Sequence, residues 1–358
     1  MIYFFGGVQI MGSDIKHDLN IRIDYNVNLL HFVDHLSQWS QYTGDDARKL
    51  YLKYFEITEQ DQKKLEKYSE IRNQLGWEAE INLFGWAYDS FKNENSPLDS
   101  KDLTEIKSII EYFANRQNDK VILDKILKDK FDELFSLKSK ILSYASSVEK
   151  NITNIEPYLN IWASEIDFQK YPLYICFSHN ENSTHGGANG QGVYSEFDIS
   201  KNEKGISRGF DTITHELIHK ITAIDDKLSE FLENDENYTE YAQVFMDKHK
   251  LDKKKLVSLF KSKDPEGFGN SEGKVFEEVN VYLFAPVLIN HMDSLRITKT
   301  FEHYKQKEMK EFARTWHGVK LFKEVYDAVS ITDYDKKEFI WSLIETFYEK
   351  IYYCNYSL

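Results

Sequence analysis

The sequence predicts an α+β protein that is predominantly α. Over most of the chain, apolar residues recur at the three- and four-residue spacing of a buried helix face. Only five of the 358 residues are proline, while the helix-favouring residues Lys, Glu, Leu and Ile are abundant. Two short segments, 171–177 and 192–199, are instead typical of strands. Hydrophobic residues make up 41 % of the chain and aromatic residues 15 %, enough to build a core.

The first 150 residues are predicted to form a mostly helical N-terminal lobe, 1–150. It begins with a strand, because residues 21–27 alternate apolar and polar side chains. Helical spacing follows over 29–39 and from 45 to about 92, and it resumes from 100 to about 148. The segment 93–98, which contains Asn and Pro, breaks the helical pattern.

Residues 151–225 are predicted to form a core of a small sheet and one helix. The apolar run 171–177 and the alternating run 192–199 are the expected strands. A polar, glycine-rich loop is expected between them. A helix with an apolar face follows over about 207–224, with Ser207 as its expected N-cap.

The remaining residues, 226–358, are predicted to form a helical C-terminal lobe. The acidic segment 225–237 is expected to be partly solvated, and 264–270 is expected to be a loop. Helices are expected over 238–250, 256–261, 275–289, 305–312, 321–329 and 336–353.

The most informative motif is His215-Glu216-Leu217-Ile218-His219, a His-Glu-x-x-His sequence within the predicted helix 207–224. Residues four apart lie about 40° apart around a helix, so both imidazoles can bind one ion. Zinc accepts neutral imidazole nitrogen and usually has three protein ligands plus water in a catalytic site. Glu216 can reach that water as general base. The motif therefore predicts a zinc site for metal-assisted hydrolysis.

The alternative is a solvated surface motif, since the pattern also arises by chance in a chain with 11 histidines. Apolar residues at helical spacing through the motif argue against it, because they give the helix a face to bury. These residues are Phe210, Ile213, Leu217, Ile221 and Ile224.

A third ligand is expected, because two histidines hold zinc weakly. Glu277 and Glu278 lie in the strongly apolar segment 275–289, which must be largely buried as a helix. A buried carboxylate without a partner is costly, so one of them should face a cation. Glu278 is preferred and Glu277 is the alternative. Pairing with a lysine, or exposure at a helix start, would explain either residue without a metal.

The glycine-rich segment is a candidate substrate-binding element. Gly186, Gly187, Ala188 and Asn189 lie in the predicted loop, directly before the second strand of the core. Glycines let backbone approach a ligand closely, and an extended peptide can add to a strand edge through main-chain hydrogen bonds. A plain hairpin loop is the alternative.

With these residues the chain resembles the gluzincins, zinc metallopeptidases with a His-Glu-x-x-His helix and a glutamate ligand on a later helix. The resemblance implies a zincin-like core, Zn²⁺ as cofactor, and metal ligation by His215, His219 and Glu278. The resemblance also makes Glu240 an alternative candidate for the third ligand. Glu240 lies 21 residues after His219, near the separation seen in thermolysin-like and aminopeptidase-like metallopeptidases. The segment 24–37 is similar to the N-terminal region of a group of uncharacterised bacterial zinc proteases.

The activity implied by the resemblance is hydrolysis of peptide bonds in a peptide or protein substrate. Glu216 would be the general base, and a further donor would bind the oxyanion. Tyr282, His317 and Tyr304 are the candidates for that donor. Two alternatives are a catalytically inactive zincin-like binding protein and a helical interaction protein in which the motif is accidental.

The charge and composition limit the partners. A net charge of −14 and a pI near 5.3 argue against nucleic acid and anionic membranes. No apolar stretch is long enough to span a bilayer. Cys176 and Cys354 are expected to be free thiols. Residues 1–12 are apolar but lack the basic region and cleavage site of a signal peptide, so a leading strand and a cytoplasmic location are favoured over secretion.

Overall fold

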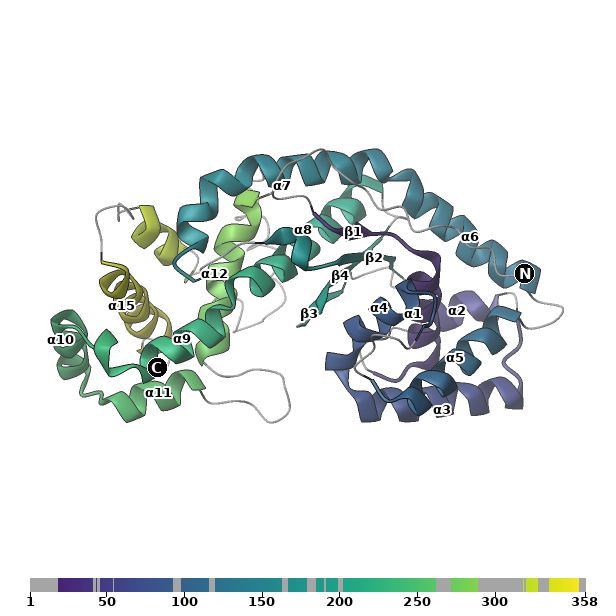
Figure 1. Cartoon of the computed structure of the whole chain (residues 1–358), viewed down its shortest axis with the longest axis horizontal. Coiled ribbons are helices and arrows are strands. Elements are labelled where there is room, and N and C mark those ends of the chain that lie inside the picture. The colour runs from purple at the N-terminus through teal and green to yellow at the C-terminus, as the bar shows by residue number, and fades with distance from the viewer. Residues whose placement is uncertain are drawn as a thin grey trace. The chain divides into compact units, whose positions relative to one another are not determined.

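The computed structural model is an α+β fold that is mostly helical and contains a four-stranded sheet, in agreement with the predicted fold class (Figure 1). It describes residues 19–40, 43, 46–53, 55–92, 98–115, 120–162, 167–178, 185–189, 191–198, 202–261, 272–288, 318, 320–327 and 335–353.

The chain divides into two compact units. The first contains residues 1–146 and 167–220, and the second contains 147–166 and 221–358. The first unit thus joins the N-terminal helices to the sheet and to most of the motif helix, whereas the sequence suggested the segments 1–150, 151–225 and 226–358. Among the described residues, no helix combines the length and apolar character needed to span a bilayer.

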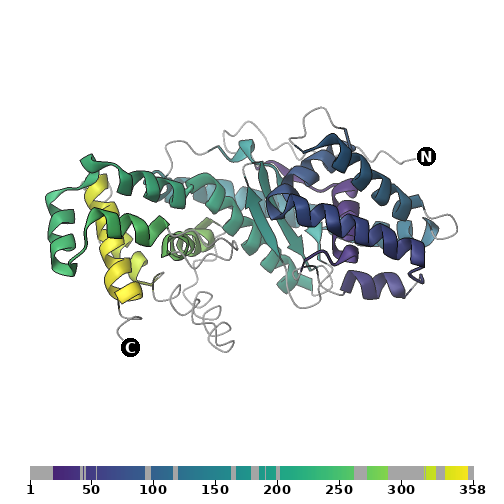
Figure 2. The same ribbon diagram turned by 90° about the horizontal axis from the view of Figure 1, so that it is seen from below.

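The sheet belongs to the first unit and has the strand order β1-β2-β4-β3. β1 (Ile21–Arg22) pairs in parallel with β2 (Leu173–Phe177), and β2 pairs in parallel with β4 (Gly192–Phe197). β3 (Gly186–Asn189) pairs antiparallel with β4 and ends the described sheet (Figure 2). The predicted strands 171–177 and 192–199 are therefore confirmed.

Helix α1 (Tyr25–Ser37) begins earlier than predicted, so the strand prediction for 21–27 was wrong beyond Arg22. Asp24 caps the helix by accepting hydrogen bonds from the N–H groups of Asn26 and Val27. This cap stops the alternating pattern from continuing as a strand. The buried Asn28 then ties α1 to β2, because its amide donates to the Ile175 carbonyl and accepts from the Phe177 N–H.

The other helices of the first unit agree with the helical predictions over 45–92 and 100–148, except at 55–58, where the chain is not helical. The break predicted at 93–98 falls mainly outside the described residues. The helices are α2 (Asp46–Leu52), α3 (Glu59–Leu75), η1 (Trp77–Ala79), α4 (Glu80–Tyr88), α5 (Ser100–Asn115), α6 (Lys120–Ser136) and α7 (Lys138–Leu159), which continues into the second unit.

The motif helix is α8 (Asn202–Thr222). It starts five residues before Ser207, so Ser207 lies inside the helix and is not its N-cap. Its predicted apolar face is buried at Ile213, Leu217 and Ile221. Ala223, in the left-handed conformation, separates α8 from the next helix.

Alternation along β4 sends its side chains to two opposite faces of the sheet. Ser195 donates to the Gly209 carbonyl, so α8 covers one face. Tyr194 and Glu196 point to the other face, where they meet Phe84 of α4 and His31 of α1, respectively. The sheet is therefore enclosed between α8 on one side and α1 and α4 on the other.

The second unit is helical around a core that includes Trp162, Phe276, Trp341 and Phe347. The prediction for 321–329 agrees with helix over 320–327, and that for 305–312 falls outside the described residues. The helices are α9 (Ile224–Glu233), η4 (Asp235–Asn237), α10 (Glu240–His249), α11 (Lys253–Lys261), α12 (Glu272–Leu288), α15 (Lys336–Phe347) and a π-helical end, η5 (Tyr348–Tyr353).

Candidate metal centre

The two histidines of the motif converge on one face of α8. His215 Nε2 and His219 Nε2 lie 3.0 Å apart, and the ring centroids lie 4.7 Å apart. Two nitrogens bound tetrahedrally to one zinc at ~2.0 Å would be about 3.3 Å apart. The pair thus has the spacing and the chemical character of two zinc ligands, and both side chains are only half-buried.

The packing of α8 against the sheet and against α7 fixes the orientation of the helix face that carries His215 and His219. Thr214, fully buried on α8, donates to the Phe210 carbonyl and lies 2.6 Å from Tyr144 Oη of α7. Burial raises the pKa of the Tyr144 phenol above its ordinary value, so the phenol stays neutral. The ring of Tyr144 stacks on Phe210 at 4.3 Å. These contacts hold the turn of helix that precedes His215.

Glu216 lies where β3 approaches α8. A Cβ built on Gly186 would lie 3.4 Å from Glu216 Cγ and 2.4 Å from Thr212 Cγ2. A side chain at position 186 would therefore displace either the strand or the helix. The half-buried Glu216 thus lies beside the backbone of an edge strand.

The predicted loop over Gly186, Gly187, Ala188 and Asn189 is wrong, because these residues form β3. Asn189 pairs with Gly192, and its side chain accepts a hydrogen bond from the Gln191 N–H, which closes a tight hairpin. β4 is an inner strand, between β2 and β3. Among the described residues, β3 pairs only with β4, so its outer edge faces away from the sheet.

One group of three side chains within the first unit has the composition and proximity of a metal site: His31, His35 and Glu196, with one ligand atom of each within 4.8 Å of the others. His215 and His219 also belong to the first unit, whereas Glu278 belongs to the second. The role of these three residues as zinc ligands, preferred from the sequence, stays a prediction.

The alternative third ligands have different surroundings. Glu277 is buried on α12, whereas Glu278 beside it is half-buried. Glu240 is exposed at the first turn of α10. Tyr282 follows Glu278 by one turn of α12 and is half-buried. His317 and Tyr304 lie outside the described residues.

The group of His31, His35 and Glu196 was missed by the sequence reasoning. His31 and His35 have the same four-residue spacing as the motif histidines, within a segment predicted to be helical. That spacing was the available signal, but the apolar residues around it favoured an ordinary core helix. Glu196 could not be associated with them, because it is 165 residues from His31 in the sequence.

Strong mutual interactions set the charges of this buried group. Burial favours the neutral acid at Glu196, but hydrogen bonds from His31 and His35 outweigh it and hold its pKa well below the ordinary range. Burial lowers the pKa of His31, while the hydrogen bond to Glu196 overcomes burial and raises that of His35. The ion pair with Glu196 therefore favours protonation of His35 over protonation of His31.

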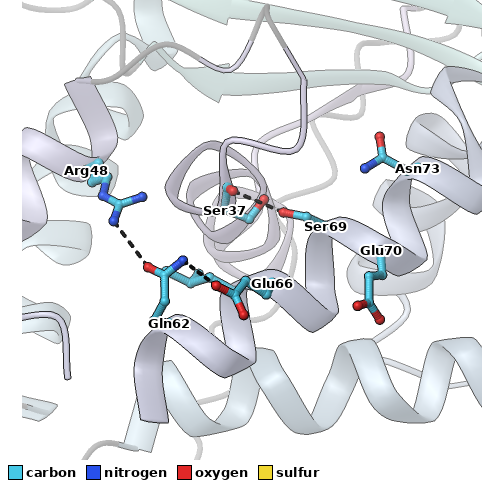
Figure 3. A pocket seen from close by; sticks show the side chains of 8 residues that line it. Ser37, Arg48, Gln62, Glu66, Ser69, Glu70 and Asn73 are labelled. Atoms are coloured by element: carbon cyan, nitrogen blue, oxygen red, sulfur yellow. Dashed lines mark hydrogen bonds between the residues drawn. The ribbon is translucent and has the colours of Figure 1, made fainter. Parts of the chain in front are cut away.

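A separate cavity of about 330 Å³ lies between the end of α1 and helices α2 and α3 (Figure 3). Arg48 donates to Gln62, which donates to Glu66, and Ser69 donates to the Ser37 carbonyl. The cavity is lined by none of the predicted site residues.

Comparison of the chain with protein-family models, with curated proteins and with solved structures finds no match.

Proposed function

We propose that the chain is a zinc-dependent peptidase of the gluzincin type. The observation that carries the proposal is the 3.0 Å approach of His215 Nε2 and His219 Nε2 on a helix whose intervening Glu216 lies against an edge strand. An accidental motif on a solvated helix would not bring the base and a peptide-binding edge together.

His215, His219 and Glu278 would hold the zinc, because two imidazoles and one carboxylate form a known catalytic donor set. When bound, zinc lowers the pKa of a water ligand and polarises the scissile carbonyl. Glu278 is the carboxylate preferred for this set, because it lies half-buried on the strongly apolar helix α12.

Glu216 accepts the proton of the attacking water and passes it to the leaving amine nitrogen. Water adds to the carbonyl carbon, the C–N bond breaks, and the products are a carboxylate and an amine. The outer edge of β3 would align an extended substrate through main-chain hydrogen bonds. Gly186 permits this by keeping the strand close to Glu216.

The test compares hydrolysis of a mixed fluorogenic peptide library by the wild type and Glu216→Gln, with zinc content measured on the same samples. The amide keeps the size of the side chain but accepts no proton, so we expect zinc to be retained and hydrolysis to fall by several orders of magnitude. Glu240→Gln, the same change at an exposed position, should leave both unchanged.

Equal hydrolysis by the wild type and Glu216→Gln would remove Glu216 as the base. If the wild type binds zinc but hydrolyses no peptide of a broad library, the alternative of a catalytically inactive zincin-like binding protein is favoured.

A further inference from the structure

We propose that His31, His35 and Glu196 form a second, structural binding site for a divalent transition metal such as zinc, in the core of the first unit. This site is distinct from the motif histidines, because it lies on the face of the sheet that α1 and α4 cover, opposite α8.

The geometry brings three donors to one point. His31 Nε2 and His35 Nε2 lie 3.0 and 3.1 Å from the same oxygen, Glu196 Oε1. The two ring centroids are 4.5 Å apart, as expected for histidines one helical turn apart that face the same point. Two imidazole nitrogens and a carboxylate oxygen are ligands that zinc accepts.

Hydrogen bonds to its second oxygen fix the orientation of the Glu196 carboxylate. Its other oxygen, Oε2, accepts hydrogen bonds from Ser178 Oγ and from the His185 N–H, both at 3.2 Å. Oε1 is thereby directed at the two imidazoles. Outer hydrogen bonds that orient a ligating carboxylate in this way are a common property of metal sites.

Burial makes a cation at this point favourable. Glu196 is 1 % exposed, His31 0 % and His35 5 %, and Glu196 lies in β4, all of whose residues are buried. A carboxylate in such a strand is costly without a compensating charge. Glu80, also buried, interacts electrostatically with both His35 and Glu196, but burial raises the pKa of its carboxyl to about 8, so Glu196 is the carboxylate that faces the ion.

The consequence of the site would be structural. It would join α1, near the start of the described chain, to β4, 165 residues later, at a position closed to substrate. Because the group is buried, the ion must enter during folding.

The test counts metal in protein from cells grown with added zinc and dialysed against metal-free buffer. We expect about two zinc per chain in the wild type and about one in His215→Ala/His219→Ala, whose buried group is unaltered. Adding Glu196→Gln to that double variant should remove the remaining zinc, because the amide is a poor zinc ligand.

A folded His215→Ala/His219→Ala variant without metal would overturn the second site, and that result does not depend on whether Glu196→Gln folds. One zinc that survives all three substitutions would also overturn it. The zincin proposal fails separately, if the wild type carries a single zinc that His215→Ala/His219→Ala retains.

Discussion

Gly186 of β3 and Thr212 of α8 are in such close contact that a Cβ on Gly186 would lie 2.4 Å from Thr212 Cγ2. This distance is far below van der Waals contact, so only glycine fits without movement. The contact sets the separation between the edge strand and Glu216, one helical turn beyond Thr212.

Gly186→Ala should therefore displace β3 from α8 and lower kcat/KM for peptides by about 10–100-fold, since misplacement by about 1 Å is that costly. Zinc content should not change, because Gly186 is not a ligand. Hydrolysis kinetics with zinc analysis on the same samples give the measurement.

A second substitution tests whether the contact with Thr212 causes this loss of activity. Thr212→Ser deletes Cγ2, so Gly186→Ala/Thr212→Ser should recover part of the lost activity, although the Tyr194 carbonyl, 2.9 Å from the new Cβ, limits the rescue. Equal activity of the single and double variants would show that this contact does not position the strand.

Glu278→Gln should weaken zinc binding at the motif histidines by more than the ~10–100-fold that loss of an outer-shell group costs. Glu277→Gln, the same change at the buried neighbour, and Glu240→Gln, at an exposed residue, should leave the zinc affinity near the wild-type value. Competition with a chelating dye measures the affinity. A larger loss in Glu277→Gln than in Glu278→Gln would reassign the third ligand.

Asp24 predicts a pH dependence of stability. Burial raises the pKa of its carboxyl from 3.8 to about 6, and hydrogen bonds from Val27 and Asn26 only partly offset this. Between these values the unfolded chain loses the proton while the folded protein keeps it, so this residue's contribution to stability falls as the pH rises to about 6. The shift corresponds to about 3 kcal/mol.

Asp24→Asn keeps an N-cap oxygen but does not titrate. Relative to the wild type, its free energy of unfolding should rise as the pH increases from 4 to 6 and stay constant above that. Urea unfolding at several pH values measures this difference, with Asp24→Ala as the variant that loses the cap. Parallel stability curves for Asp24→Asn and the wild type would contradict the assignment.

The sequence predicted most helices and the two longer strands, because their apolar residues follow a clear period over many positions. β3 was missed, because Gly186 and Gly187 have low strand propensity and the strand is stabilised by pairing with β4. Asp24 shows how one cap overrides an alternating pattern.

The candidate sites also differ in whether a local sequence pattern predicts them. His215 and His219 are predictable, because helical spacing alone brings them together. The His31, His35 and Glu196 group depends on the packing of α1 against β4, and no local pattern links residues so far apart in the sequence.

Anomalous diffraction at the zinc absorption edge, from crystals of the wild-type protein purified with zinc, tests the central claim most directly. We predict a peak about 2.0–2.1 Å from the Nε2 atoms of both His215 and His219. Zinc-loaded crystals without anomalous density between these two histidines would contradict the account.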